Sequence, residues 1–189
     1  LSRAVVLRPP IVGEKTFAWG VLGEQIVTGS NIGGFYIFED GAWRKILDPV
    51  LGVSFQLYSS LAFHDRLLMG QYPTGRVWEF DGEKLTDLKG WPPVMEGVRG
   101  RAREAQTTTV YGGEIIVGVW PWGEVWRRNP AGKQWTFGRR MFPHPKPTKE
   151  TTNPYDIENQ NNTPSDYWGQ RVTSLIVSGS DLFVGTSAK

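Results

Sequence analysis

The sequence predicts an all-β fold built from repeated four-stranded antiparallel sheets, and three observations support this prediction. The 189 residues include 9 Trp, 9 Phe, 6 Tyr and 23 Gly, a composition that favours half-buried strands joined by tight turns. A pattern of one polar residue, three mostly apolar residues and one glycine occurs four times. Strand and turn signals surround each copy in the same order.

The repeated pattern defines one strand type that each unit uses once. Its four copies are 25–29, 66–70, 114–118 and 181–185. A short apolar strand and a hairpin turn precede each copy. A loop ending in glycine and an aromatic-rich strand follow the first three, with Tyr36, Trp78 and Trp126 at the same place. Tight turns such as Asp81-Gly82 then lead to a further strand, so we expect four strands in a unit.

The spacing of the repeated glycine sets the size of the unit. The glycine recurs after 41, 48 and 67 residues, and four-stranded propeller blades repeat about every 40 to 50 residues. The longest interval contains an insertion at 141–170 that is rich in Pro, Asn and Thr, which is typical of loop. The units therefore cover approximately residues 17–50, 55–95, 105–142 and 172–189.

In this repeat the chain resembles β-propeller repeat proteins as a broad class, over most of Phe17–Lys189. Neither a WD dipeptide nor a kelch-type double glycine recurs, so the resemblance implies an architecture and no subfamily. A β-sandwich is the alternative, although a sandwich has no need for the same residues in every fourth strand. About three and a half blades are visible, and we expect residues 1–189 to form a single propeller domain or fragment.

The fourth unit stops after Gly185, before its loop and aromatic strand. Propellers have about four to eight full blades. We therefore expect one of two arrangements: either the segment Ala4–Leu7 completes the last blade, or the chain is part of a larger closed propeller.

Charge and composition exclude several classes of function. The 21 basic and 19 acidic residues give a net charge of only +2, so we expect neither nucleic acid nor membrane as a partner. The absence of Cys excludes thiolate chemistry, and 2 His argue against a metal site. No motif for a cofactor is present, so none is predicted. The compartment stays open, with an extracellular or periplasmic one slightly favoured.

Loops that join the second and third strands, and loops that join blades, should lie on one face around the central channel. Aromatic and basic residues in these segments are the predicted ligand-binding residues: Tyr72, Trp120, Trp122, Trp168 and Arg171. Two Trp in one short loop are expected to stay partly exposed and to stack on sugar rings. Local packing at the channel mouth is the alternative.

Catalytic candidates are few and weak: His64, His144, Tyr167 and Arg171. In residue types they resemble propeller-based polysaccharide lyases, and this resemblance implies His or Tyr for proton transfer and Arg to neutralise a uronate carboxylate. His64 lies at a predicted hairpin on the opposite face, where a role in the turn is the alternative. Whether the chain is an enzyme stays open.

Basic and acidic residues alternate between the second and third units: Glu96, Arg99, Arg101, Arg103 and Glu104. We expect a solvent-exposed loop whose charges balance one another. A phosphate or carboxylate site is the alternative.

The leading functional hypothesis is recognition of a carbohydrate or similar polar ligand through aromatic loops on one face. A polysaccharide lyase or glycosidase on the same scaffold is the first alternative. The second is a protein-interaction scaffold, since Trp, Tyr and Arg are also enriched at interface hot spots.

Overall fold

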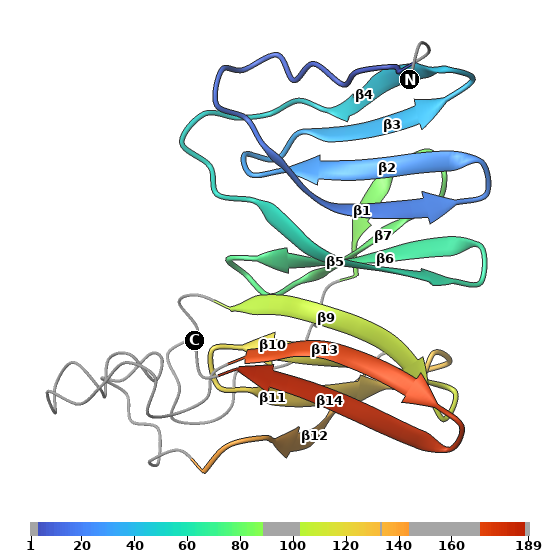
Figure 1. Ribbon diagram of the computed structural model, residues 1–189, viewed down its shortest axis with the longest axis vertical. Coiled ribbons are helices and arrows are strands. Elements are labelled where there is room, and N and C mark those ends of the chain that lie inside the picture. The colour runs from blue at the N-terminus through green and yellow to red at the C-terminus, as the bar shows by residue number, and fades with distance from the viewer. Residues whose placement is uncertain (1–3, 89–102, 133, 144–170, 188–189) are drawn as a thin grey trace, which may run out of the picture.

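The computed structural model describes residues 4–88, 103–132, 134–143 and 171–187. These residues form three four-stranded antiparallel sheets and one two-stranded sheet, which we call blades 1 to 4 (Figure 1). Within each sheet the spatial order of the strands is their order along the chain. The predicted all-β architecture of propeller blades is confirmed.

The repeated pattern falls on the second strand of every blade, as predicted. Blade 1 consists of β1 (Thr16–Leu22), β2 (Gln25–Ser30), β3 (Phe35–Glu39) and β4 (Ala42–Leu47). Blade 2 consists of β5 (Gln56–Phe63), β6 (Arg66–Tyr72), β7 (Val77–Phe80) and β8 (Leu85–Asp87). Blade 3 consists of β9 (Glu104–Tyr111), β10 (Glu114–Trp120), β11 (Glu124–Arg128) and β12 (Trp135–Arg140). Blade 4 is described for β13 (Arg171–Ser178) and β14 (Asp181–Ser187).

The first strands of the blades are the inner ones. β1 contacts β5, β5 contacts β9, and β9 contacts β13. Each sheet extends away from its first strand, so the four first strands form a continuous inner row, which is the arrangement of blades in a propeller.

The repeated strand is continuously apolar because both of its faces are covered. In β6, Leu67 and Met69 belong to the core between blades 1 and 2. The residue between them, Leu68, points to the other face and belongs to the core between blades 2 and 3. A strand buried on both sides reads as an apolar run rather than as an alternating pattern.

In the outermost blades, one face of the repeated strand has no neighbouring blade among the described residues, and side chains on that face are exposed. Phe183 of β14 occupies the position of Leu68, the one that faces the following blade, and it is 59% exposed. Ile26 of β2 occupies the position of Leu67, which faces the preceding blade, and it is also exposed. Burial of the repeated strand therefore depends on the neighbouring blade.

The repeated glycine is needed because the next blade packs directly on it. The contacts join Gly29 to Leu57, Gly70 to Ala105 and Gly118 to Val172. A Cβ added at Gly70 would meet the carbonyl oxygen of Ala105 and would lie 2.7 Å from its Cβ. Any side chain at this position would push the inner strand of the next blade away.

The N-terminal segment does not complete the last blade. Residues 4–7 form no strand, and the indole Nε1 of Trp43 in β4 donates a hydrogen bond to the carbonyl oxygen of Val5 at 3.3 Å. The expectation that this segment joins blade 4 is wrong, because blade 1 holds it. The division of the chain into domains stays a prediction. Within the described ranges, no helix is long and apolar enough to cross a membrane.

Candidate functional site

Each inner strand is irregular near its first residue. The pairing register shifts between Leu57 and Ser59 in β5, between Ala105 and Thr107 in β9, and near the start of β1 and β13. The extra residues in β5 and β9 are Tyr58 and Gln106. Such a β-bulge bends the strand and changes the direction of a side chain, and bulges are frequent beside functional sites.

The bulges lie at one end of the blades, where the inner strands begin and the repeated strands end. In Figure 1, β1, β9 and β13 run from left to right, so this end is on the left. Six side chains at this end are linked by the contacts described below, and we call them the mouth cluster: Tyr58, Tyr72, Glu104, Gln106, Trp120 and Arg171.

An ion pair between blades 3 and 4 forms the polar half of the mouth cluster. Nη1 of Arg171 donates to Oε1 and Oε2 of Glu104 at 3.2 and 3.1 Å, and to Oε1 of Gln106 at 2.6 Å. The guanidinium carbon of Arg171 lies 5.6 Å from the ring centre of Trp120. One nitrogen of the guanidinium is thus fixed by two polar side chains, and an aromatic ring packs against the group.

Aromatic rings form the other half of the mouth cluster. The ring centres of Trp120 and Tyr72 are 6.1 Å apart, and those of Tyr72 and Tyr58 are 6.3 Å apart with an interplanar angle of 80°. Phe17 of blade 1 continues the row, 5.6 Å from Tyr58. The hydroxyl of Tyr58 donates to Oε1 of Gln56 at 2.6 Å. The row runs from Phe17 in blade 1, through the ends of inner and second strands, to Arg171 in blade 4.

Burial shifts the pKa values of two groups in the mouth cluster, Glu104 and Tyr58. The Glu104 side chain is 3% exposed, and burial raises the pKa of its carboxyl while the Arg171 cation opposes the rise. Burial, and then the negative charge of Glu104, raise the pKa of the Tyr58 hydroxyl. Tyr58 is therefore a poor general base near neutral pH.

Part of the Arg171 guanidinium is open. Within the described part of the chain, all of its hydrogen bonds leave from Nη1, and no described residue accepts from Nε or Nη2. The side chain is 29% exposed. These remaining N–H groups can donate to a ligand.

The structure brings together three of the predicted ligand-binding residues, Tyr72, Trp120 and Arg171. Trp122 is different, since it is only 2% exposed and its ring packs against the guanidinium of Arg140 in β12 at 5.3 Å. The expectation that both Trp of this loop stay exposed is therefore wrong for Trp122. Its burial supports the loop that carries Trp120.

His64 lies where the sequence predicted a hairpin turn, and its catalytic role stays a prediction. It lies in the turn between β5 and β6, at the end of blade 2 opposite the mouth cluster, with a φ of 53°. Its ring packs against Phe63 at 4.3 Å. The other two catalytic candidates, His144 and Tyr167, and the binding candidate Trp168 lie outside the described residues, so their roles stay predictions.

The charged segment before blade 3 is not a solvent-exposed loop at its C-terminal end. Arg103 is buried, and its Nη2 donates to Oε2 of Glu124 at 2.9 Å. The same oxygen accepts a hydrogen bond from Nε1 of Trp126. The expectation is wrong for Arg103 and Glu104 because both pair with residues beyond their own segment. Glu96, Arg99 and Arg101 lie outside the described residues.

Sequence reasoning missed Tyr58 and Gln106, and it placed Glu104 in a charged loop rather than in this cluster. A usable signal was present, because Gln56, Glu104 and Arg171 each open an inner strand and are polar. Aligning the first residues of the inner strands would have placed them at the same end of the blades. In the parts of the chain that the structure describes, no three His, Asp or Glu side chains gather as metal ligands would.

No protein-family model matches the chain, and no curated protein sequence matches it either. Among solved structures, the chain is similar to one described as "YCF48 bound to D1 peptide", with 12% sequence identity and a TM-score of 0.43. The match covers 60% of this chain and 36% of that one. A similarity this weak is no basis for an argument about function.

Proposed function

We propose that this chain is a carbohydrate-binding propeller module whose mouth cluster holds a hydroxyl-rich polar ligand. The observation that carries the proposal is the arrangement of Arg171. Its Nη1 group is fixed by Glu104 and Gln106, while no described residue accepts from its other N–H groups, which lie beside Trp120 and Tyr72.

This combination suits the two kinds of surface on a sugar ring. Hydroxyl groups both donate and accept hydrogen bonds, and Arg171 and Gln106 supply donors and acceptors, while the buried Glu104 holds Arg171 in place. The apolar face of a sugar packs on aromatic rings, which Tyr58 and Tyr72 supply. Both kinds of group lie within one row of contacts, as binding of a small polar ligand requires.

Cleavage of a polysaccharide has less support than binding. A lyase needs a base to abstract a proton, and the raised pKa of Tyr58 works against that role. Neutralisation of a uronate carboxylate needs an available cation, whereas Glu104 already compensates the charge of Arg171. Among the described residues, Glu104 is also the one carboxylate of the mouth cluster, and glycosidases use a pair.

The proposal is tested by screening the chain against a glycan array and measuring affinities of the hits by titration calorimetry. Arg171→Lys is expected to weaken binding at least about tenfold, because it removes guanidinium donors and a charge-assisted hydrogen bond is worth about 1.5 to 3 kcal/mol. Tyr72→Ala is also expected to weaken binding, because it removes an aromatic ring on which a sugar can pack. Trp19→Ala is the control, since Trp19 is half exposed but packs against Trp43 on blade 1, away from the mouth cluster.

Thermal unfolding of each variant shows whether it is folded. If no glycan binds, or if folded Arg171→Lys and Tyr72→Ala bind as well as the unchanged chain, the proposal is wrong. Binding of a protein surface that depends on the same two residues would favour the interaction-scaffold alternative instead.

A further inference from the structure

The charge of the mouth cluster bears on the class of saccharide that fits it. Among the residues that the structure describes, Arg171 is its one cation and Glu104 its one carboxylate, and they are 3.1 Å apart at their nearest atoms. Three further arginines near this end of the blades are also in ion pairs. These pairs are Arg76 with Asp87, Arg103 with Glu124 and Arg140 with Glu124.

We infer that Glu104 makes the mouth cluster select neutral saccharides over acidic ones. The inference rests on the proposed function. It assigns to Glu104 a role in specificity rather than direct contact with the ligand.

The first reason is that the negative charge of Glu104 cannot move away. Its side chain is 3% exposed, and both oxygens are held by Nη1 of Arg171. Water therefore screens this charge little. A uronate carboxylate that approached the open edge of Arg171 would meet a cation whose charge is already compensated, and it would lie a few ångströms from a buried carboxylate.

The second reason is that the open edge still suits a neutral acceptor. The Nε and Nη2 groups of Arg171 can donate to a hydroxyl or ring oxygen without adding charge to the site. Gln106 is an uncharged amide beside them, 2.6 Å from Nη1. The hydrogen-bonding groups at the mouth thus fit a ligand with no charge of its own.

The sharpest experiment changes the charge of Glu104 and keeps its shape. Glu104→Gln retains a carbonyl oxygen that can accept from Arg171, but it leaves the cation uncompensated. Glu114→Gln makes the same change in an ion pair with Arg127, at the opposite end of blade 3, and is the matched control.

Each variant is titrated with a neutral glycan and with its uronate-bearing counterpart. The unchanged chain and Glu114→Gln are expected to bind the neutral glycan at least about tenfold more tightly. Glu104→Gln is expected to reduce this preference to about threefold or to reverse it. Equal or tighter binding of the acidic glycan by the unchanged chain, or an unchanged ratio in Glu104→Gln, would overturn the inference.

A second measurement needs no variant and covers the case in which Glu104→Gln does not fold. Oligogalacturonate and its fully methyl-esterified form share one backbone and differ in charge, and the unchanged chain is expected to prefer the ester. Preference for the free acid contradicts the inference and leaves the proposed function standing. Failure to bind any glycan, neutral or acidic, contradicts the proposed function itself.

Discussion

The two ends of the blades are held together by different kinds of contact. At the mouth end, neighbouring blades are joined through groups with little freedom to move, such as Gly70 against Ala105 and the buried Glu104 against Arg171. At the opposite end, the polar contacts between blades are hydrogen bonds in and between hairpin turns, such as that from Gln25 to Gly82.

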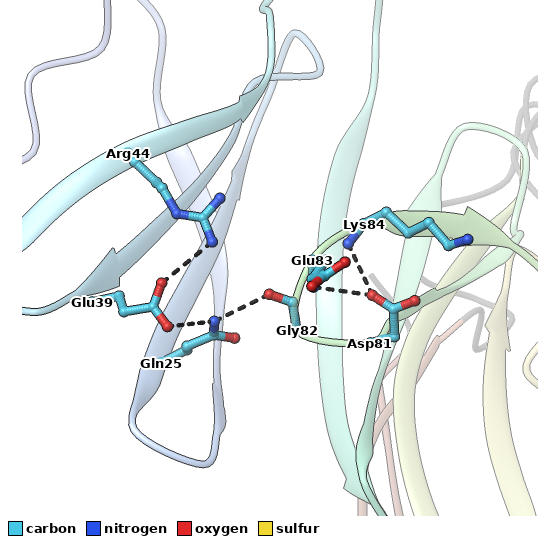
Figure 2. Close-up of polar contacts among 7 residues, drawn as sticks. All are labelled: Gln25, Glu39, Arg44, Asp81, Gly82, Glu83 and Lys84. Atoms are coloured by element: carbon cyan, nitrogen blue, oxygen red, sulfur yellow. Dashed lines mark hydrogen bonds and ion pairs between the residues drawn. The ribbon is translucent and has the colours of Figure 1, made fainter.

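Figure 2 shows the best connected example at the turn end. Nε2 of Gln25 donates to Oε1 of Glu39 in its own blade at 2.8 Å and to the carbonyl oxygen of Gly82 in blade 2 at 3.1 Å. Arg44 pairs with the other oxygen of Glu39 at 3.3 Å, and both side chains are more than a third exposed. Water competes for every partner in this network, so each contact contributes little.

The comparison teaches where a substitution should matter. Groups at the mouth end are covered by the next blade, so a change there leaves a clash or an unpaired charge. Groups at the turn end face water, which replaces a lost partner. The predictions below set matched changes at the two ends against each other.

The largest effect is expected for Gly70→Ala, with a loss of about 3 kcal/mol or more in the free energy of unfolding. The new Cβ would collide with the backbone of Ala105, which is fully buried and has no room to shift. Gly132→Ala, in a turn at the other end, has its nearest atom at 3.5 Å and should change the stability by about 0.5 kcal/mol or less. Urea unfolding measures both, and equal losses would show that the blades do not pack on the repeated glycine.

Arg171→Met comes next, because it leaves the buried Glu104 without its cation. We expect a loss of about 2 kcal/mol, below the 3 to 5 kcal/mol for a fully buried pair since Arg171 is partly exposed. Arg127→Met breaks the pair with Glu114 at the turn end, where Arg127 is 52% exposed, and should cost about 0.5 kcal/mol or less.

The same variant has a predicted pH dependence. Burial raises the pKa of Glu104 above its ordinary value of 4.5, and removal of Arg171 raises it further. The folded state then holds the proton of Glu104 to a higher pH than the unfolded state does, so the stability falls as the pH rises. Chemical unfolding at several pH values should show that Arg171→Met loses more free energy of unfolding, relative to the unchanged chain, as the pH rises above 4.5. If this loss becomes smaller with rising pH, the account is wrong.

The fold could be predicted from the sequence because the propeller repeat constrains side chains directly. A strand covered on both faces must be apolar throughout, as in Leu67 to Met69, and close packing of the next blade requires glycine at Gly70. These requirements recur wherever one blade packs on the next, so they leave a pattern that is visible without a structure.

The site could be predicted only in part. Tyr72, Trp120 and Arg171 were found because strand order alone places their segments at one end of the blades. Tyr58 and Gln106 were missed because a β-bulge changes the direction of a side chain and has no composition of its own. The burial of Trp122 was missed because it depends on a residue of another strand.

A smaller effect is expected for Gln25→Ala at the turn end. The variant loses the hydrogen bonds to Glu39 and Gly82, and we expect the free energy of unfolding to fall by about 1 kcal/mol, since water reaches all three groups. Thermal unfolding measures this change. A loss in the free energy of unfolding greater than that of Arg171→Met would show that contacts at the turn end contribute more to stability than those at the mouth end.

The smallest effect is expected for His64→Asn in the turn between β5 and β6. The φ of 53° lies in the left-handed region, which Asn adopts more readily than most residues, so the stability should change by less than about 0.5 kcal/mol. His64→Val places a β-branched side chain at the same φ and should lose about 1 kcal/mol or more. Since His64 lies at the opposite end from the mouth cluster, both folded variants should bind glycans as the unchanged chain does. A binding loss in His64→Asn would return His64 to the functional site and break the separation between the two ends.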